Sequence, residues 1–377
     1  MSLRERMRGA ESDGAKQERF RKYGVLDNPF PAAGQPVGHP RREDEVDDLV
    51  ADRVRQFEVP GRPSQVVTVE GTQGVGKTNL LNYYEAQFRD YYQEDEAFYI
   101  IRYYPDPEPT FDSLLRKVFQ NLDEGHFAAI GRKLAESDVD VRNRAKEIAG
   151  GYEVRIVLNS LEQAGSNEEL ILECAQLALE WFVGLRVLKR HREVLGVSFR
   201  LDTVESRTQA LRDIVYVSEE LGLLKGILLL LDELEKQDYS LSKTPVLRFL
   251  SAIRALIDAL PRCLFLMLAM TPQARLRYFG MLPALAGRLQ DRIELKSLGE
   301  PSEAQELGAF YLRNARAAAR SDTQMGRVEQ GATPFPPDHR VGVLFDELRR
   351  QSEERGTEGV TQRDFLHRLH AEWEQTA

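Results

Sequence analysis

One eight-residue segment constrains the fold of this chain more than any other part of it. Its members, in chain order, are Gly71, Thr72, Gln73, Gly74, Val75, Gly76, Lys77 and Thr78. They match the pattern G-x-x-x-x-G-K-[ST], in which glycines let the backbone turn sharply so that successive N–H groups face a phosphate. A β-branched run, residues 66–69, precedes the segment, and a helical pattern with Leu80 and Leu81 follows it. The order strand, loop, helix predicts a phosphate-binding loop in an α/β protein.

Two side chains at the end of this loop predict its ligands. In this pattern the lysine, here Lys77, reaches the β- and γ-phosphates of a nucleotide, and the hydroxyl of Thr78 ligates Mg²⁺. ATP and Mg²⁺ are therefore the expected cofactors. The alternative is a glycine-rich turn with an incidental lysine, which the flanking strand and helix disfavour.

A second, acidic site follows another apolar run. Residues 227–231 are continuously apolar, as is typical of a strand covered on both faces, and Asp232 and Glu233 come directly after them. Ligands of open α/β sheets bind at the carboxyl ends of the strands, so both carboxylates are expected at that edge. We expect Asp232 to hold the Mg²⁺ shell and Glu233 to polarise a water molecule as general base. The chain is therefore predicted to be an ATPase that converts ATP and water to ADP and phosphate.

The rest of the chain predicts an α/β fold with a five-stranded parallel sheet in a three-layer core. The expected strands are residues 66–69, 98–103, 227–231, 264–270 and 292–295. Residues 121–224 have a mostly helical pattern and predict a helical insertion. The expected domains are an N-terminal arm and loop (1–40), an ATPase core (41–300) and a helical lid (301–377). Within the lid, the expected helices span 303–320, 341–355 and 362–373, with a proline-containing break at 333–337.

Composition excludes several other classes of protein. A formal net charge of −9 argues against a surface that binds nucleic acid all over, although it permits a local basic patch. Two cysteines, Cys174 and Cys263, cannot build a disulfide framework or a four-ligand zinc site, and their apolar surroundings predict buried, inert thiols. The apolar runs are far shorter than the roughly 20 residues that span a bilayer, and no secretory signal is expected, because no apolar segment follows Arg8. A soluble cytoplasmic protein without a membrane partner is expected.

Taken together, these elements resemble the AAA+ superfamily of P-loop ATPases and, within it, the origin-recognition and transposition-regulator ATPases. The resemblance covers about residues 41–362. It rests on residues 42–45, the phosphate loop, Asp232 and Glu233, Thr271, and residues 282–289 with the strand 292–295. Residues 210–233 also resemble the ATP-binding proteins of bacterial phage-exclusion gene clusters (BrxD-like).

The resemblance implies roles for three further residues. Thr271 would be a polar sensor between the phosphate loop and the acidic pair, the alternative being a strand-ending threonine before Pro272. Arg288 would be an arginine finger that reaches a neighbour's γ-phosphate, with Arg292 as its rival and a solvated arginine as the alternative. Arg363 would be the second sensor on the lid, the alternative being a surface arginine on a helix.

The chain departs from the family's pattern in two places. The span from Lys77 to Asp232 is longer than in a minimal AAA+ core, which places the helical insertion between the second and third strands. Origin-recognition proteins carry a winged-helix domain after the lid, and the residues after Trp373 leave no room for one. Base-specific reading of DNA is therefore not expected.

The densest basic stretch, residues 186–192, carries four formal positive charges. Helical spacing would place Arg186, Lys189 and Arg190 on one face, where they would grip the phosphates of double-stranded DNA without sequence preference. The alternative is a solvated helix face.

The predicted function is an ATP-driven switch that assembles into a homo-oligomer and acts on DNA, or is recruited to it, in transposition, replication or defence against mobile elements. A protein partner is also expected. The alternative is a STAND-like signalling NTPase, in which nucleotide exchange exposes the helical insertion to a protein partner without DNA contact.

Overall fold

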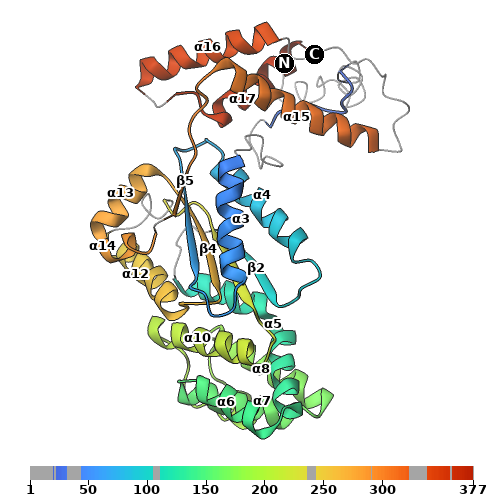
Figure 1. Cartoon of the computed structure of the whole chain (residues 1–377), viewed down its shortest axis with the longest axis vertical. Coiled ribbons are helices and arrows are strands. Elements are labelled where there is room, and N and C mark those ends of the chain that lie inside the picture. The colour runs from blue at the N-terminus through green and yellow to red at the C-terminus, as the bar shows by residue number, and fades with distance from the viewer. Residues whose placement is uncertain are drawn as a thin grey trace, which may run out of the picture. The chain divides into compact units, whose positions relative to one another are not determined.

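A computed structural model describes residue Phe20 and residues 23–31, 44–104, 111–235, 243–289, 291–321, 338–356 and 359–376 (Figure 1). Residues 1–19 of the expected arm, the loop 32–40 and the break at 333–337 lie outside these ranges. The chain divides into two compact units. The sheet unit comprises Asp44–Glu70 and Leu81–Ile293. The lid unit takes its described residues from the N-terminal segment, from Gly71–Leu80 and from Glu294–Ala377.

The sheet has five strands in the order β2-β3-β4-β1-β5. Their bounds are Gln65–Glu70 (β1), Phe98–Tyr103 (β2), Gly226–Leu231 (β3), Leu264–Met270 (β4) and Asp291–Glu294 (β5). β4 pairs in parallel with both β1 and β3, and β3 pairs in parallel with β2. The carboxyl ends of β1 and β3 therefore lie at one edge of the sheet, on either side of the end of β4. This confirms the predicted five-stranded α/β sheet.

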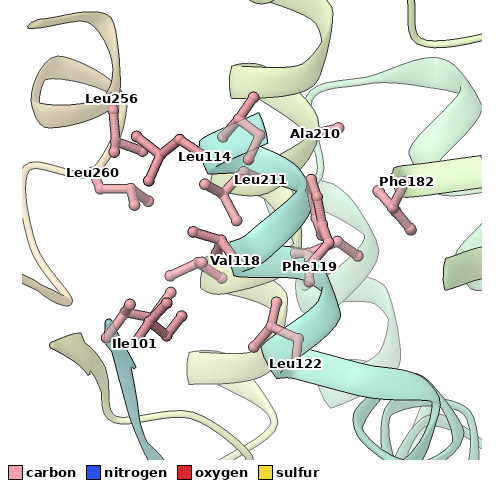
Figure 2. Close-up of a cluster of buried hydrophobic side chains, with 14 of the residues drawn as sticks. Ile101, Leu114, Val118, Phe119, Leu122, Phe182, Ala210, Leu211, Leu256 and Leu260 are labelled. Carbon is pink, nitrogen blue, oxygen red and sulfur yellow. The ribbon is translucent and has the colours of Figure 1, made fainter. Parts of the chain in front are cut away.

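Helices cover both faces of the sheet, so every residue of β3 and β4 is buried. On one face, Phe57 of α3 (Asp44–Glu58) and Phe88 of α4 (Lys77–Tyr91) pack against Phe265 of β4, with ring centroids 5.9 and 5.6 Å away. Successive residues of a strand point to opposite faces, so Leu264 and Leu266 face the other layer. That layer is α5 (Phe111–Glu136), α10 (Val204–Glu220) and α12 (Lys243–Ala259), whose buried side chains meet in one cluster (Figure 2).

The predicted insertion is helical, and it includes part of α5 and all of α10 from this second layer. Its other helices are α6 (Val139–Ile148), α7 (Tyr152–Ala164), α8 (Glu168–Phe182) and α9 (Lys189–Leu195). Local sequence explains where several of them begin, since Asp138, Asn167 and Thr203 cap α6, α8 and α10 with their side-chain oxygens. The rings of Phe119 and Phe127 both stack on Phe182 inside the bundle.

The lid unit contains α15 (Pro301–Ser321), α16 (Asp338–Arg355) and α17 (Gln362–Thr376). Its core is built around Trp373, which is fully buried. The rings of Phe20, Tyr23 and Phe30 surround the Trp373 ring at centroid distances of 6.0, 4.8 and 5.5 Å. The Asn28 amide also donates to the carbonyl oxygen of His370, at 3.2 Å. Residues 23–31 therefore belong to the core of the lid unit.

The structure can be compared with two expectations from composition, the burial of the cysteines and the lack of a membrane-spanning segment. Cys174 and Cys263 are free and buried, as predicted, and burial raises the pKa of Cys174 to about 11 and that of Cys263 to about 12. Within the part of the chain that the structure describes, no helix is long and apolar enough to cross a bilayer.

Candidate nucleotide-binding site

The phosphate loop joins the end of β1 to the start of α4, as the sequence predicts. Gly74 and Gly76 adopt φ values of 87° and 108°, a region that side chains other than glycine rarely enter. A Cβ atom at Gly71 would lie 2.9 Å from the carbonyl oxygen of Leu295, so the backbone there also needs the absence of a side chain. The glycines of the motif are therefore required by the geometry of the loop.

Lys77 is the first residue of α4, and its ammonium is turned back onto the loop. Its Nζ atom donates to the carbonyl oxygens of Gly71 and Thr72, at 2.8 and 3.2 Å. Thr78 follows in the first turn of the helix and is half-buried. Unpaired N–H groups and the helix dipole make the N-terminus of α4 favourable for an anion, and Lys77 lies within this environment.

The lid helix α17 begins directly against this loop. Thr361 caps the helix, because its Oγ1 accepts from the main-chain N–H of Asp364 at 3.1 Å. The next two residues contact the loop: Arg363 donates its main-chain N–H to the carbonyl oxygen of Gly74 at 3.0 Å, and the side chain of Gln362 covers Gly76. Arg363 was predicted as a site residue, and its side chain is exposed. Gln362, which is 4% exposed, was missed by the sequence analysis.

The acidic pair lies at the carboxyl end of β3. Asp232 is fully buried, and its two oxygens are both engaged. Oδ2 accepts from Nη2 of Arg102 on β2 at 2.7 Å, and Oδ1 accepts from the main-chain N–H of Glu233 at 2.8 Å. Glu233 itself is half-buried and has a φ of 49°, the left-handed conformation that turns the chain away from the strand. Arg102 gave no signal in the sequence as a partner of this site.

Thr271 directly follows β4 and therefore lies between the ends of β1 and β3 in the strand order. Its Oγ1 accepts from the main-chain N–H of Ala274 at 3.2 Å and so caps α13 (Pro272–Met281). This hydrogen bond fits the alternative, a threonine that ends a strand before Pro272, and the sensor role stays a prediction.

The two candidate arginine fingers are both held within the chain. Arg288, which follows α14 (Pro283–Ala286), places Nε 2.5 Å from Oδ1 of Asp258 and donates from Nη1 to the carbonyl oxygen of Ala284 at 2.6 Å. Arg292 on β5 lies 2.5 Å from the buried carboxylate of Glu70, the residue directly before the phosphate loop. Arg292 is therefore tied to the base of its own loop.

The basic stretch at residues 186–192 is arranged differently from the prediction. Arg186 lies in a non-helical segment, and α9 begins only at Lys189, so helical spacing does not set the three basic side chains on one face. Arg190 forms an ion pair with Glu173 at 2.8 Å, and Lys189 forms one with Glu193 at 3.4 Å. This expectation was wrong because a glycine turn at residue 184 (φ 79°) ends α8 before the basic residues begin.

Two predicted ligand residues, one in each unit, carry oxygen donors of the kind that magnesium prefers. Mg²⁺ usually keeps several waters and is bound through one or two carboxylates plus the phosphates of its substrate. Among the described residues, no group of three or more His, Cys, Asp or Glu side chains makes a dedicated metal cage. Asp232 in the sheet unit supplies a hard carboxylate donor, and Thr78 in the lid unit supplies a hydroxyl donor.

The fold and these geometries define an α/β protein with a phosphate loop after its first strand. No protein-family model matches the chain, and no curated protein matches it. Among solved structures, it is similar to the ORC2 protein of Aeropyrum pernix in ADPNP–ADP complexes, with 11% identity over 93% of this chain and 72% of that one and a TM-score of 0.44. It is also similar to the Aeropyrum pernix ORC1 protein in complex with DNA, with 13% identity over 94% of this chain and 69% of that one and a TM-score of 0.38. Likeness at this level carries no argument about family or ligands.

Proposed function

We propose that this chain is an ATPase of the AAA+ type, which binds ATP with Mg²⁺ and hydrolyses it. The conformation of the phosphate loop carries the proposal: two glycines at positive φ follow a buried parallel strand, and a lysine opens the next helix. Such a loop presents its main-chain N–H groups to phosphate oxygens. The acidic pair after β3 supplies the second half of the chemistry.

Each predicted residue has a role in this proposal. Lys77 would leave the carbonyl oxygens of its own loop to bind the β- and γ-phosphates. Thr78 and Asp232 would hold Mg²⁺, which would supply positive charge against the phosphoryl group that is transferred. Glu233 orients and deprotonates the attacking water. Thr271 and Arg363 report the presence of the γ-phosphate from β4 and from the lid.

The proposed output is self-assembly. Arg288 leaves Asp258 in the assembly and reaches the γ-phosphate held by a neighbouring copy. The assembly then acts on DNA through the side chains of Arg186, Lys189 and Arg190, which are exposed.

A second candidate function is a signalling NTPase whose insertion binds a protein partner. It is favoured by the ion pairs that neutralise Lys189 and Arg190, and by exposed apolar side chains of the insertion. Phe199 is 72% exposed, and Tyr152 is 70% exposed. Stimulation of ATP hydrolysis by duplex DNA supports the DNA-linked function, whereas hydrolysis that DNA does not change favours the signalling function.

The experiment that tests the ATPase proposal compares two variants with matched controls. Lys77→Ala removes the only side-chain cation of the loop, so it should abolish binding of a fluorescent ATP analogue, whereas Lys117→Ala, which changes an exposed lysine of α5, should not. Glu233→Gln should bind ATP normally and lose about 10²-fold or more in turnover, the usual scale for a lost general base. Glu94→Gln, at an exposed position, should keep full turnover. Normal turnover by Glu233→Gln would show that another group is the base.

A further inference from the structure

Arg102 places a positive charge inside the sheet unit, beside the acidic pair. It lies on β2 opposite Leu230 of β3, two positions before Asp232. Its neighbours Ile101 and Tyr103 belong to the apolar cluster on one face of the sheet, so Arg102 points to the opposite face, the face covered by α4. The Arg102 side chain is 5% exposed, and that of Asp232 is fully buried.

The ion pair between these two residues occupies the atoms that a metal would need. Nη2 of Arg102 lies 2.7 Å from Oδ2 of Asp232, and the other carboxylate oxygen accepts from the main-chain N–H of Glu233. A magnesium ion, or a water in its shell, would therefore approach a carboxylate whose charge Arg102 already neutralises. The guanidinium also repels a divalent cation across a buried, low-dielectric space, where charges interact strongly.

The Arg102 guanidinium is poorly satisfied in this arrangement. Its Nε and Nη1 atoms are buried, and neither finds a hydrogen-bond partner among the residues that the structure describes. Buried N–H groups without acceptors are costly, and a charged group makes the cost larger. The ion pair with Asp232 therefore leaves Arg102 with a free-energy cost. An arrangement that offers more acceptors to its Nε and Nη1 atoms would lower that cost.

A second contact links the pair to the helix of the phosphate loop. Oδ1 of Asn82, on α4, accepts from the hydroxyl of Tyr104 at 3.2 Å and lies 3.4 Å from Nη2 of Arg102. The guanidinium carbon lies 4.8 Å from the centre of the Tyr104 ring. Asn82 comes five residues after Lys77 on the same helix, so a shift of α4 when phosphate binds also moves an acceptor of Arg102.

We propose that Arg102 is a gating residue for the metal: it neutralises Asp232 in the nucleotide-free chain and leaves it when nucleotide and Mg²⁺ bind. Arg102 thereby sets the Mg²⁺ concentration at which nucleotide is held tightly. The inference rests on the proposed function, because it takes Asp232 as the magnesium ligand. It assigns Arg102 a positioning role, since the residue acts through Asp232.

The test is a Mg²⁺ titration of the binding of a fluorescent ADP analogue, with EDTA defining the metal-free baseline. Arg102→Met keeps length and apolar bulk but removes the charge, so it should lower the Mg²⁺ midpoint by about tenfold or more. Affinity for ADP in EDTA should stay within about twofold of wild type, because Asp232 then has no ligand to hold. Arg102→Lys keeps the charge and should restore a midpoint close to that of wild type.

The matched control is Arg89→Met. Arg89 lies on α4, pairs with Glu85 and donates to the carbonyl oxygen of Ile100 on β2, yet it does not contact Asp232. Its midpoint should equal that of wild type. A Mg²⁺ midpoint that Arg102→Met leaves unchanged, or raises, overturns the inference.

If Arg102→Met fails to give a cooperative thermal transition, Arg102→Gln replaces it, since it keeps an N–H donor toward Asp232 without the charge. The expected Mg²⁺ midpoint, and the result that would overturn the inference, are the same as for Arg102→Met. A wild-type chain that binds no nucleotide with Mg²⁺ present overturns the proposed function itself. Wild-type binding with normal Mg²⁺ dependence in every Arg102 variant overturns the gating role alone.

Discussion

The main-chain N–H of Arg363 donates to the carbonyl oxygen of Gly74 at 3.0 Å, which joins the first turn of the lid helix α17 to the phosphate loop. The side chain of Gln362, one residue earlier, is buried against Gly76. A loop that changes shape on binding phosphate must therefore move the start of α17. In the proposed function, this contact would link the lid to a nucleotide bound at the loop without relying on any side-chain charge.

Gly76→Ala should disrupt both the loop and its contact with the lid. The residue has a φ of 108°, and an added Cβ would lie 3.0 Å from Oε1 of Gln362. We expect nucleotide affinity to fall at least tenfold and the free energy of unfolding to fall by about 1–3 kcal/mol, the usual cost of such backbone strain. The measurements are a binding titration and denaturant unfolding.

Gly342→Ala is the matched control for this change. Gly342 lies inside α16, and a Cβ there would meet nothing within 4 Å. The substitution should raise the free energy of unfolding by about 0.5–1 kcal/mol and leave nucleotide binding unaltered. Wild-type affinity in Gly76→Ala would contradict the role given to the loop.

Arg363→Ala tests the second sensor without removing the main-chain hydrogen bond to Gly74, because alanine keeps the N–H. We expect affinity for a non-hydrolysable ATP analogue to fall by about tenfold, the effect of losing about 1.4 kcal/mol of charged hydrogen bonding. Affinity for ADP should fall by less than about threefold, which is half of that change on a logarithmic scale. Arg368→Ala, which removes another exposed arginine of α17, should change neither value. Equal losses for both nucleotides would mean that Arg363 does not sense the γ-phosphate.

Local patterns in the sequence predict the elements of this fold well, because each pattern reports its own surroundings. Residues 227–231 and 264–270 are continuously apolar since both faces of the strands are covered, and the structure has β3 and β4 there. The capping pattern that opens α17, with Thr361 three residues before Asp364, is equally local. Such signals place strand ends and helix starts, and through them the phosphate loop and the acidic pair.

Contacts between distant segments leave no such pattern. Arg102 and Asp232 are 130 residues apart, and they meet only because β2 pairs with β3. Trp373 gathers Phe20, Tyr23 and Phe30 from the opposite end of the chain, which periodicity within a window cannot anticipate. The error at Arg186 has a different origin, since basic residues are compatible with a helix and the glycine turn before them decides the backbone.

Acid should destabilise the sheet unit through His126. The Tyr99 hydroxyl lies 2.7 Å from Nδ1 of His126, and Nε2 lies 2.9 Å from the Ser218 hydroxyl. Because that hydroxyl already donates to the carbonyl oxygen of Ile214, it accepts from Nε2, and Nδ1 accepts from Tyr99. This network requires a neutral ring with its proton on Nε2. Burial lowers the pKa of His126 to about 4, against an opposing effect from Asp123.

The direction of the pH effect follows from that shift. Between about pH 6.5 and 4 the unfolded chain binds a proton at His126 that the folded chain does not, so stability falls as the pH falls through this range. The loss is at most about 3 kcal/mol. In His126→Gln the fall in unfolding free energy over this range should be smaller by about that amount. His367→Gln, at an exposed position, should keep the wild-type profile, and an unchanged profile in His126→Gln would contradict the assignment.

Arg288→Ala tests whether the arginine acts on a neighbouring copy. The variant should bind ATP normally and hydrolyse it about 10²-fold more slowly, within the range found for lost transition-state donors. Mixing it with Glu233→Gln should restore part of the turnover, because some interfaces then pair an intact base with an intact finger. ATP should also raise the mass of the wild-type protein in solution.

Two controls define what Arg288→Ala measures. Arg254→Ala removes the other arginine that pairs with Asp258 and should leave turnover unaltered. Arg292→Ala, which removes the ion pair with Glu70, should lower turnover without rescue in the mixture, since it acts inside its own chain. Rescue by Arg292→Ala in place of Arg288→Ala would transfer the finger to Arg292. A monomeric ATP-bound protein with normal Arg288→Ala turnover would exclude action in trans.

Binding of duplex DNA is the last prediction, and the ion pairs of the basic stretch limit its strength. Glu173 and Glu193 neutralise Arg190 and Lys189, so one subunit contributes few free charges to a phosphate backbone. Each subunit neutralises about three phosphates at most. A plot of log affinity against log salt concentration should therefore have a slope no steeper than about −3 per subunit. Useful affinity therefore requires several subunits on one duplex, and binding should depend on ATP if ATP drives assembly. A titration of labelled duplex at low salt, with and without a non-hydrolysable ATP analogue, measures both effects.

A charge reversal locates the surface that holds the DNA. Changing Arg186, Lys189 and Arg190 to glutamate should abolish ATP-dependent binding and leave basal ATP hydrolysis intact. The matched control reverses two arginines and one lysine that are exposed elsewhere on the same insertion, namely Lys133, Arg144 and Arg155. Both triple variants change the net charge by the same amount, so a difference between them reports position and not overall charge. Equal loss in the two variants would assign the effect to net charge, and binding that survives the first reversal would place the DNA on another face.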